Sequence, residues 1–440
     1  MKSSVICFRC RYLCVSLSLA LVVSLALGCA GGAGPSVHTY LAGSHCFGNA
    51  IDADGNIWVA NGGNGFPGTD PGESNVMKLS PSGTVLGTYL VGSIPIGLVI
   101  DKSGNVWVEN YGNGTPGTLA GESSITELSP SGVTIGTFVA GKYPDGGMAI
   151  DASGNVWVTN WGAASSGTST PGTPGPGPED SNVSVLSPTG VKIGTYVAGS
   201  SPGGIAIDSA GNVWVANKGN GTRGTGLMES NVTKLSPSGV KIATYLAGSF
   251  PEGLAVDPDG NIWVVNKGNG IPGTLAANSN VTKLSPSGAT IGTYVVGSYP
   301  EVVAIDSAGN VWVTNGYGQG GVTQKNSSVT ELSPSGTLIY TYATGFQPYS
   351  IAIDNSGNVW VTNYEKSRKE RSAKCGGEDS QGGAHAPPKG SPRGATEAIR
   401  QGGGWRCVGK IGEKVELKRR EAARVWTLAA SRGVSSKWLL

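Results

Sequence analysis

The chain has 440 residues, of which 72 are glycine and only 14% are charged. Ordinary soluble proteins contain about 7% glycine and about 25% charged residues, so this composition disfavours a helical protein and favours short strands joined by tight turns. Residues 1–364 carry 14 Lys and Arg against 21 Asp and Glu. This acidic balance excludes a cationic surface for nucleic acid in that part of the chain.

The first 29 residues have the pattern of an export signal. Lys2, Arg9 and Arg11 precede an apolar run over residues 12–27, which Gly28 and Cys29 follow. A basic start, an apolar run and small residues at its end predict a secretory signal, and the run is shorter than the roughly 20 residues that span a bilayer. We therefore expect an exported protein, either secreted or held in a bacterial cell envelope.

Cys29 is the candidate residue for lipid attachment. Gly28-Cys29 resembles a bacterial lipoprotein cleavage site, in which the cysteine is lipidated and becomes the new N-terminus, although Ala26 stands where such sites usually have Leu. Ordinary cleavage near residues 30–33 and an uncleaved anchor are the alternatives. Membrane contact, where it persists, is made by the signal or the lipid, and residues 30–36 are a linker.

A repeat fills the body of the chain from residue 37 to residue 364. Its hallmark, Gly-Asn-(Ile/Val)-Trp-Val, recurs at Trp58, Trp107, Trp157, Trp214, Trp263, Trp312 and Trp360. Asp lies six residues before each of these tryptophans, and Asn lies three residues after each of them. Seven matches at spacings of 48 to 57 residues indicate seven copies of one structural unit.

One copy of the repeat reads as four strands. In the fourth copy we expect strands over residues 204–208, 212–217, 230–235 and 240–246, because these runs are rich in β-branched and aromatic residues and are bounded by Gly, Pro, Asn and Ser. Four strands in a repeat of about 40–50 residues are typical of a β-propeller. We expect the tryptophans to pack between blades rather than to bind sugars. The Asp-x-Asp-Gly-Asn segments at residues 52–56 and 257–261 resemble the start of a calcium loop, but we expect them to be tight turns.

The two ends of the repeat region are expected to share one blade. Residues 37–43 match the fourth strand of a unit, whereas the seventh unit supplies only a first strand over residues 350–354 and a second over residues 358–363. The third-strand motif Ser-Asn-Val-Thr-x-Leu does not recur after residue 364. We therefore predict an all-β, seven-bladed β-propeller of four-stranded blades over residues 37–364, whose last blade is closed by the N-terminal strand and is one strand short.

Residues 37–364 resemble the NHL-repeat β-propellers, and among them the virginiamycin B lyase (streptogramin lyase) branch, through the motif Ala-Ile-Asp-x-x-Gly-Asn-Val-Trp-Val-Thr-Asn. The lyase branch implies a reaction served by histidines that follow a proline, by a glutamate at the end of the second strand, and by a magnesium ion. In this chain the residues after that proline are Ile96, Asp145, Gly203, Glu252, Glu301 and Tyr349. Asn replaces the strand-end glutamate in all seven units, so we expect no catalytic residues of that kind and favour a protein that is not an enzyme.

The long loops between second and third strands are expected to lie on one face of the propeller. Variable loops on a rigid scaffold are where binding concentrates, so we expect this face to hold a small ligand or a protein. The candidate ligand-binding residues there are Asp145, Glu252, Glu301, Lys218, Lys267 and His45. The three carboxylates are expected to ring one mouth of the channel, where they could coordinate a divalent cation, and the two lysines could receive an anion. Solvated side chains are the alternative, and we expect no other cofactor or metal.

Residues 365–440 differ from the body of the chain. They carry 17 Lys and Arg against 8 Asp and Glu and are rich in glycine, which predicts a solvated, disordered tail. A non-native C-terminus that arose by frameshift or insertion, and a basic arm for an anionic polymer, are the alternatives. The whole sequence thus favours a monomeric, exported or membrane-anchored binding module. A virginiamycin B lyase-like enzyme with a displaced or degenerate site is the second hypothesis.

Overall fold

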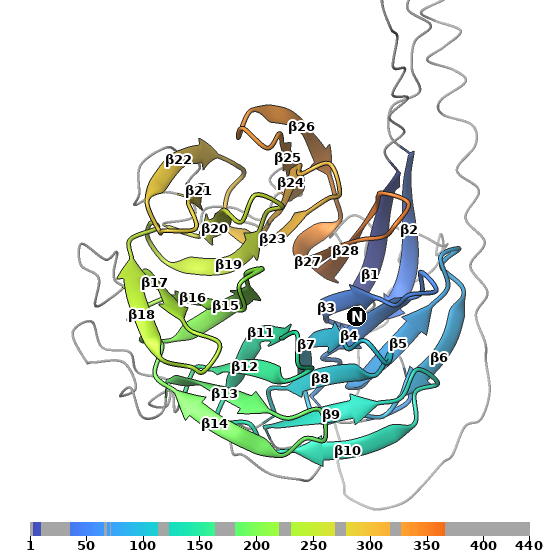
Figure 1. Cartoon of the computed structure of the whole chain (residues 1–440). Coiled ribbons are helices and arrows are strands. Elements are labelled where there is room, and N and C mark those ends of the chain that lie inside the picture. Colours follow the sequence, from blue (N-terminus) through green and yellow to red (C-terminus); the bar gives the residue numbers. More distant parts are fainter. Residues whose placement is uncertain are drawn as a thin grey trace, which may run out of the picture. The chain divides into compact units, whose positions relative to one another are not determined.

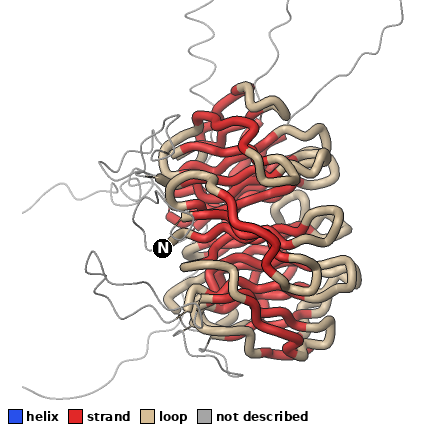
Figure 2. Tube along the Cα trace, turned by 60° about the vertical axis from the view of Figure 1, so that its left-hand side comes forward, coloured by secondary structure: helices blue, strands red, loops and turns tan. Residues whose placement is uncertain are grey.

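The computed structural model describes residues 3–9, 36–65, 68–70, 72–112, 123–162, 181–219, 230–268, 279–316 and 327–365. These residues form strands and turns (Figure 2), and none of them belongs to a helix that could span a membrane. The prediction of an all-β protein is confirmed. Cys29, most of the long loops and the tail from residue 366 onward lie outside the described residues.

The strands fall into four classes by their distance from a central axis. The innermost strands are β3 (Cys46–Ile51), β7 (Pro95–Ile100), β11 (Pro144–Ile150), β15 (Pro202–Ile207), β19 (Pro251–Val256), β23 (Pro300–Ile305) and β27 (Phe346–Ile353). The second strands are β4 (Ile57–Asn61), β8 (Val106–Asn110), β12 (Val156–Asn160), β16 (Val213–Asn217), β20 (Ile262–Asn266), β24 (Val311–Asn315) and β28 (Asn358–Glu365). The third strands are β5 (Asn75–Leu79), β9 (Ser124–Leu128), β13 (Asn182–Leu186), β17 (Asn231–Leu235), β21 (Asn280–Leu284), β25 (Ser328–Leu332) and β1 (Ser3–Arg9). The outermost strands are β6 (Val85–Tyr89), β10 (Thr134–Phe138), β14 (Lys192–Tyr196), β18 (Lys241–Tyr245), β22 (Thr290–Val295), β26 (Leu338–Ala343) and β2 (Ser36–Gly43).

The sheets follow one another around the axis (Figure 1). Six sheets consist of four consecutive strands each, and we number them blades 1 to 6 in chain order from β3–β6 to β23–β26. A further sheet, which we call the closing sheet, has the strand order β2-β1-β28-β27. Each innermost strand contacts the innermost strand of the next sheet, and β27 contacts β3. The described residues therefore form a β-propeller with four-stranded blades.

The repeated tryptophans pack each sheet against its neighbour. All five residues of β16 are buried, as a strand covered on both faces requires. Trp214 is fully buried in a cluster with Leu254 and Ile262 of the next blade, and it stacks on Tyr245 with ring centroids 5.5 Å apart. Trp360 of the closing sheet packs in the same way against Ile57 of blade 1. The prediction that the tryptophans are packing residues is confirmed.

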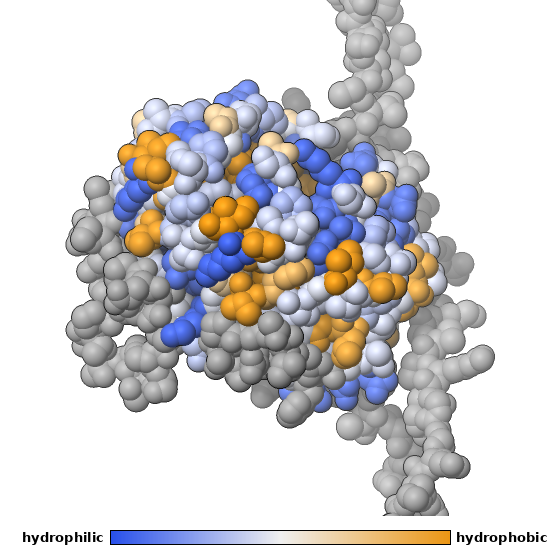
Figure 3. All heavy atoms as spheres, turned by 60° about the horizontal axis from the view of Figure 1, so that its bottom comes forward, coloured by the Kyte–Doolittle hydropathy of each residue, from blue (hydrophilic) through white to orange (hydrophobic). Residues whose placement is uncertain are grey.

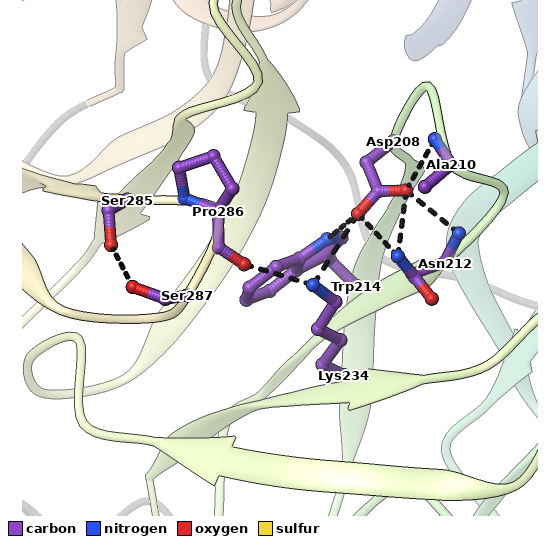
Figure 4. A network of polar contacts seen from close by, with 8 residues as sticks. All are labelled: Asp208, Ala210, Asn212, Trp214, Lys234, Ser285, Pro286 and Ser287. Atoms are coloured by element: carbon purple, nitrogen blue, oxygen red, sulfur yellow. Dashed lines mark hydrogen bonds and ion pairs between the residues drawn. The ribbon is translucent and has the colours of Figure 1, made fainter.

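The turn between first and second strands is tied to the tryptophan by its aspartate (Figure 4). One carboxylate oxygen of Asp208 accepts hydrogen bonds from the backbone N–H groups of Ala210 and Asn212, and the other accepts one from Trp214 Nε1 at 3.0 Å. Lys234 of the third strand pairs with the same carboxylate and donates to the carbonyl oxygen of Pro286 in the next blade. Since Asp208 holds both the turn and the tryptophan, the prediction of a tight turn is confirmed for this motif.

The closing sheet departs from the sequence prediction in one respect. β2 does occupy the outermost position of the sheet that contains the C-terminal strands, but the sheet is not one strand short, because β1 (Ser3–Arg9) lies between β2 and β28. Those residues lie within the predicted export signal over residues 1–29. β2 begins at Ser36 and β28 ends at Glu365, each one residue beyond the limits of 37 and 364 that the repeat predicts.

The rim of the propeller keeps apolar side chains in solvent. Ile135 of β10 and Ile193 of β14 are 54% and 55% exposed, and Ile242 of β18 repeats the pattern. Figure 3, which views the molecule from the bottom of Figure 1, shows apolar patches scattered among polar residues on this side. Isolated exposed apolar residues are normal on protein surfaces, so the rim alone indicates no site.

Candidate functional site

The variable side chains of the repeat meet at one mouth of the channel. In blades 4 to 6 the proline that opens the innermost strand pairs with the asparagine that ends the second strand, as in Pro251 and Asn266. The residue after that proline and the residue after that asparagine are therefore neighbours at this end of the blade. The long loops leave the second strands at the same end, so this mouth belongs to the long-loop face.

The residue that precedes each innermost strand, or lies at its start, has an unusual backbone conformation. Seven residues have φ between 48° and 54°, and they are His45, Ile94, Tyr143, Ser201, Phe250, Tyr299 and Gln347. Only a few per cent of non-glycine residues adopt positive φ. Hydrogen bonds hold it here: the N–H of Phe250 donates to Ser230 Oγ of the preceding blade, and its carbonyl accepts from the N–H of Lys267. The backbone at Phe250 is thus held by hydrogen bonds on both sides.

Four of the predicted candidates form one chain of ion pairs across blades 4, 5 and 6. Lys218 Nζ lies 2.6 Å from Glu252 Oε1, and Lys267 Nζ lies 3.1 Å from Glu252 Oε2. Lys267 Nζ also lies 2.6 Å from Glu301 Oε2. The four side chains are only 10–13% exposed, so the residues that the sequence analysis assigned to a cation site and to an anion site pair with one another.

The electrostatics of this ion-pair chain differ at its two ends. Burial opposes the charged form of Glu252, but the ammonium groups of Lys218 and Lys267 outweigh burial and hold the pKa of Glu252 below its usual value. Burial likewise opposes the charge on Lys267, but Glu252 and Glu301 raise the pKa of Lys267 well above its usual value. At Glu301, burial together with the charge of Glu252 outweighs the lysine charges and raises the pKa of Glu301. Glu301 is the carboxyl group here that most readily takes up a proton.

A divalent cation at Glu252 and Glu301 would have to compete with lysine side chains. Lysine ammonium groups already lie within 3.1 Å of the carboxylates of Glu252 and Glu301, where a hard cation would need those oxygens as ligands. No group of three or more His, Cys, Asp and Glu side chains suited to a metal occurs among the described residues. Asp145 lies in β11 on the other side of the mouth, and its side chain lies outside the described part of the chain.

A pocket of about 420 Å³ opens at the mouth beside Glu301. Its lining residues come from blades 1 and 6 and from the closing sheet, and they are Phe47, Tyr299, Glu301, Gly316, Gln347, Pro348, Tyr349 and Tyr364. The ring of Phe47 contacts Tyr349 and Tyr364 at centroid distances of 5.1 Å and 5.2 Å. The pocket thus combines an aromatic wall with one carboxyl group, and we call it the aromatic pocket.

Gly316 makes room for this pocket. The residue that follows the second-strand asparagine is Tyr111, Trp161, Lys218, Lys267 or Tyr364 in five of the sheets, and Gly62 or Gly316 in the other two. Gly316 lines the aromatic pocket and Gly62 does not. A larger side chain at Gly316 would extend toward Glu301, whose carboxylate lies 3.4 Å from the position of an added Cβ.

His45, the last predicted candidate, stands behind the aromatic pocket. Its ring contacts the edge of Tyr364 at a centroid distance of 4.8 Å, and its buried Nδ1 atom has no hydrogen-bond partner in the described part of the structure. His45 therefore supports the wall of the pocket and is not among its lining residues.

The aromatic lining was missed in the sequence analysis, although a signal was present. Tyr299 and Gln347 precede the proline of the innermost strand, and Tyr364 follows the asparagine of the second strand. Each position holds a different residue from sheet to sheet while the flanking residues repeat. Variation at a fixed position of a regular repeat would have identified these residues as candidates.

The fold of the described residues is that of virginiamycin B lyase. The selenomethionine-substituted enzyme from Staphylococcus aureus matches with a TM-score of 0.51 at 13% identity, over 73% of this chain and 95% of the enzyme. A streptogramin B lyase structure matches with a TM-score of 0.52 at 14% identity, over 73% of this chain and 94% of that one. A catalytically inactive variant of the S. aureus enzyme with quinupristin matches with a TM-score of 0.50 at 13% identity, over 73% of this chain and 95% of that variant. No protein-family model matches the chain, and no curated protein sequence does.

Proposed function

We propose that this protein is an exported, monomeric binding module, a seven-bladed β-propeller of the NHL type, that holds a small ligand in the aromatic pocket. The closing sheet serves as the seventh blade. The export signal over residues 1–29, with Cys29 as the site of lipid attachment, places the propeller in the cell envelope or outside the cell. The observation that carries the binding role is the pocket itself.

The pocket favours a ligand with a flat, largely apolar ring. Aromatic side chains bind such rings by edge and face contacts, with ring centroids about 4.5–7 Å apart, and a pocket of about 420 Å³ is within the usual range for small-molecule sites. Glu301 is the single acidic group in the lining. A ligand with an amine or another hydrogen-bond donor beside its ring therefore fits better than an anionic ligand.

The test compares binding of three aromatic probes to matched variants. Tryptamine, tryptophol and indole-3-acetate are titrated into the full chain, and binding is followed by ligand-observed NMR. We expect saturable binding of tryptamine, weaker binding of tryptophol and none of indole-3-acetate. Tyr occupies the position of Gly316 in two other sheets, so Gly316→Tyr should fold and abolish binding.

Tyr299→Leu and Tyr143→Leu form the matched control pair. Both residues precede an innermost strand with positive φ, and only Tyr299 lines the aromatic pocket. Tyr299→Leu should weaken tryptamine binding at least tenfold, and Tyr143→Leu should leave it unchanged. Equal binding by the parent chain and by Gly316→Tyr would remove the pocket from the proposal.

The second candidate function is a carbon–oxygen lyase with a displaced site. It is favoured by Glu301, because a carboxyl group with a raised pKa beside an apolar pocket is suited to act as a general acid or base. The structures with a similar fold also include virginiamycin B lyases. Elimination leaves the mass of a cyclic lactone unchanged, so quinupristin is incubated with the protein, with and without magnesium, and its ring opening is followed by chromatography and fragmentation. Intact quinupristin after prolonged incubation would exclude this candidate, and ring opening that Glu301→Gln abolishes would support it.

A further inference from the structure

The third strand of the closing sheet comes from a different part of the chain than the third strands of the other six sheets. In blades 1 to 6 the third strand follows the second strand in the chain. In the closing sheet the third strand is β1, which precedes every other described residue. β1 runs antiparallel to both β28 and β2, so it fills a slot between two strands rather than extending an edge.

The register of β1 against β28 is that of a third strand. Ser4 pairs with Asn363, as Asn231 pairs with Asn217 in blade 4. Phe8 then pairs with Val359, which is the position where Leu235 pairs with Val213. On the other side Val5 pairs with Tyr40, as Val232 pairs with Tyr245.

The sequence of β1 also matches the third strands of the other sheets. Ser3-Ser4-Val5 corresponds to Ser123-Ser124-Ile125 in blade 2 and to Ser327-Ser328-Val329 in blade 6. Phe8 stands where the six blades have leucine. Four blades have Asn at the second position, as at Asn231, so the pattern shared by all seven sheets is Ser-(Ser/Asn)-(Val/Ile)-x-x-(Leu/Phe).

Each part of this pattern has a structural role in the other blades. The serine hydroxyl bridges two blades: Ser230 Oγ donates to the carbonyl of Lys218 and accepts from the N–H of Phe250. The apolar residues are buried, since Val232 and Leu235 have no exposed surface. A strand without this pattern would leave an unsatisfied polar group or a cavity between blades.

Residues outside β1 also pack β2 against the rest of the propeller. Tyr40 of β2 stacks on Trp360 of β28 with ring centroids 5.7 Å apart, and Ala42 of β2 is buried in a cluster with Ile57 of blade 1. β2 also contacts β4 and β5. Among the described strands, β2 pairs through its backbone only with β1, so removal of β1 exposes two facing rows of N–H and C=O groups.

We propose that this slot is a strand-binding site. Ser3–Phe8 fills it in the full chain, and an extended segment of a partner protein binds there once Ser3–Phe8 is displaced. The ligand class is a peptide with the pattern Ser-(Ser/Asn)-(Val/Ile)-x-x-(Leu/Phe), bound antiparallel to both β28 and β2. Backbone pairing supplies the affinity of such strand addition, and the alternate side chains supply its specificity. Cleavage of the proposed export signal before Cys29 would remove Ser3–Phe8, so an exported molecule would present the slot open.

The binding test uses the full chain with its own strand ejected. Val5 and Phe8 stand at positions that are buried in the six blades, so Val5→Asp with Phe8→Asp should displace β1. A labelled peptide of residues 1–11, with Cys7 and Cys10 replaced by Ser, is then titrated and followed by fluorescence anisotropy. We expect saturable 1:1 binding to the variant and at least tenfold weaker binding to the parent chain, where β1 competes at high effective concentration. A peptide of scrambled sequence should not bind.

Two outcomes of this titration would overturn the proposal. One is the absence of binding to a variant whose circular dichroism and tryptophan fluorescence show an intact propeller. The other is a complex of two copies of the variant chain, instead of one chain with one peptide, which would assign the slot to a second copy of this protein. Neither result bears on the aromatic pocket, whose ligand is tested separately.

A disulfide trap tests the register in a chain that keeps β1. Cys7 is the partner of His38 across the β1–β2 pair, and Thr39 is the partner of Ile6. In a background with Cys10 and Cys14 replaced by Ser, His38→Cys should form a disulfide with Cys7 under mild oxidation, and Thr39→Cys should not. Peptide mapping by mass spectrometry detects the link. Failure of His38→Cys to link in a folded chain would contradict occupation of the slot by Ser3–Phe8.

Discussion

The two faces of the propeller use the same repeat in opposite ways. On the face of the short turns, a tryptophan Nε1 donates to the turn aspartate at 3.0–3.2 Å in every one of the seven copies. At the mouth on the long-loop face, the residues at the start of the innermost strand vary. No two sheets have the same triplet beginning with the residue of positive φ. Residues that repeat hold the blades together, and residues that break the repeat give the mouth its chemistry.

The largest effect is expected from a repeated residue. Trp214→Ala removes a fully buried side chain that packs between blades 4 and 5, and a truncation of this size destabilises a protein by about 5 kcal/mol. Thermal unfolding followed by tryptophan fluorescence should show a large drop in Tm. Trp263→Ala in blade 5, with the same contacts one blade further on, should behave alike. A small effect at either position would mean that the repeat does not carry the stability.

A somewhat smaller loss is expected at the mouth from Glu252→Gln. This change removes the carboxylate that pairs with Lys218 and one of the two carboxylates that pair with Lys267. The loss of one partner from a buried ion pair lowers the free energy of unfolding by about 3 kcal/mol. Urea denaturation measures the change in the free energy of unfolding. The double variant Lys218→Met with Glu252→Gln restores the balance of charge and should recover part of the loss. No recovery would argue against coupling between the two side chains.

The change in Tm caused by Glu301→Gln should vary with pH in the opposite sense to the change caused by removal of a stabilising carboxylate. Because the folded protein raises the pKa of Glu301, ionisation of this group disfavours folding, and the penalty is fully present above the raised pKa. It disappears as the pH falls toward the usual value of 4.5. The Tm of Glu301→Gln relative to the parent should therefore rise as the pH increases from that value toward neutrality. Glu252→Gln removes a group with a lowered pKa, so its loss of Tm should grow as the pH rises from that lowered pKa to the usual value of 4.5 and stay constant above it.

The blades could be predicted from the sequence because each carries its own complete set of repeated residues. Asp208, Trp214 and the strands that hold them lie within one unit, so spacing along the chain determines which residues meet. The ion-pair chain could be predicted only in part, since Lys218 and Glu252 come from different blades and their distance depends on how the blades stack. Their separate charges were visible, and their pairing was not.

The aromatic pocket and β1 were missed for two different reasons. The pocket is formed by what blade 6 lacks, because Gly316 leaves space where a neighbouring sheet has Tyr364, and an absent side chain gives no motif. β1 was hidden by a second pattern in the same residues. Lys2 and Arg9 flank Ser3–Phe8 and, with the apolar run that follows, indicate an export signal, so the match of Ser3–Phe8 to the third-strand motif was passed over.

The smallest predicted effect concerns blade 2, which differs from blades 1, 4 and 5 on the face of the short turns. Lys78, Lys234 and Lys283 pair with their turn aspartates and donate to a proline carbonyl of the next blade, whereas blade 2 has Glu127 at this position. Burial and the charge of Asp101 raise the pKa of Glu127, so its ionised form disfavours folding near neutral pH. Glu127→Lys should replace this repulsion by an ion pair and stabilise the protein by about 1 kcal/mol, a rise in Tm of about 2 °C. The gain should shrink as the pH falls toward the usual value of 4.5, where Glu127 of the parent becomes protonated. Lys234→Glu, the matched reverse change in blade 4, should lower Tm near neutral pH. If both variants shift Tm in the same direction, the lysines on the face of the short turns do not link neighbouring blades.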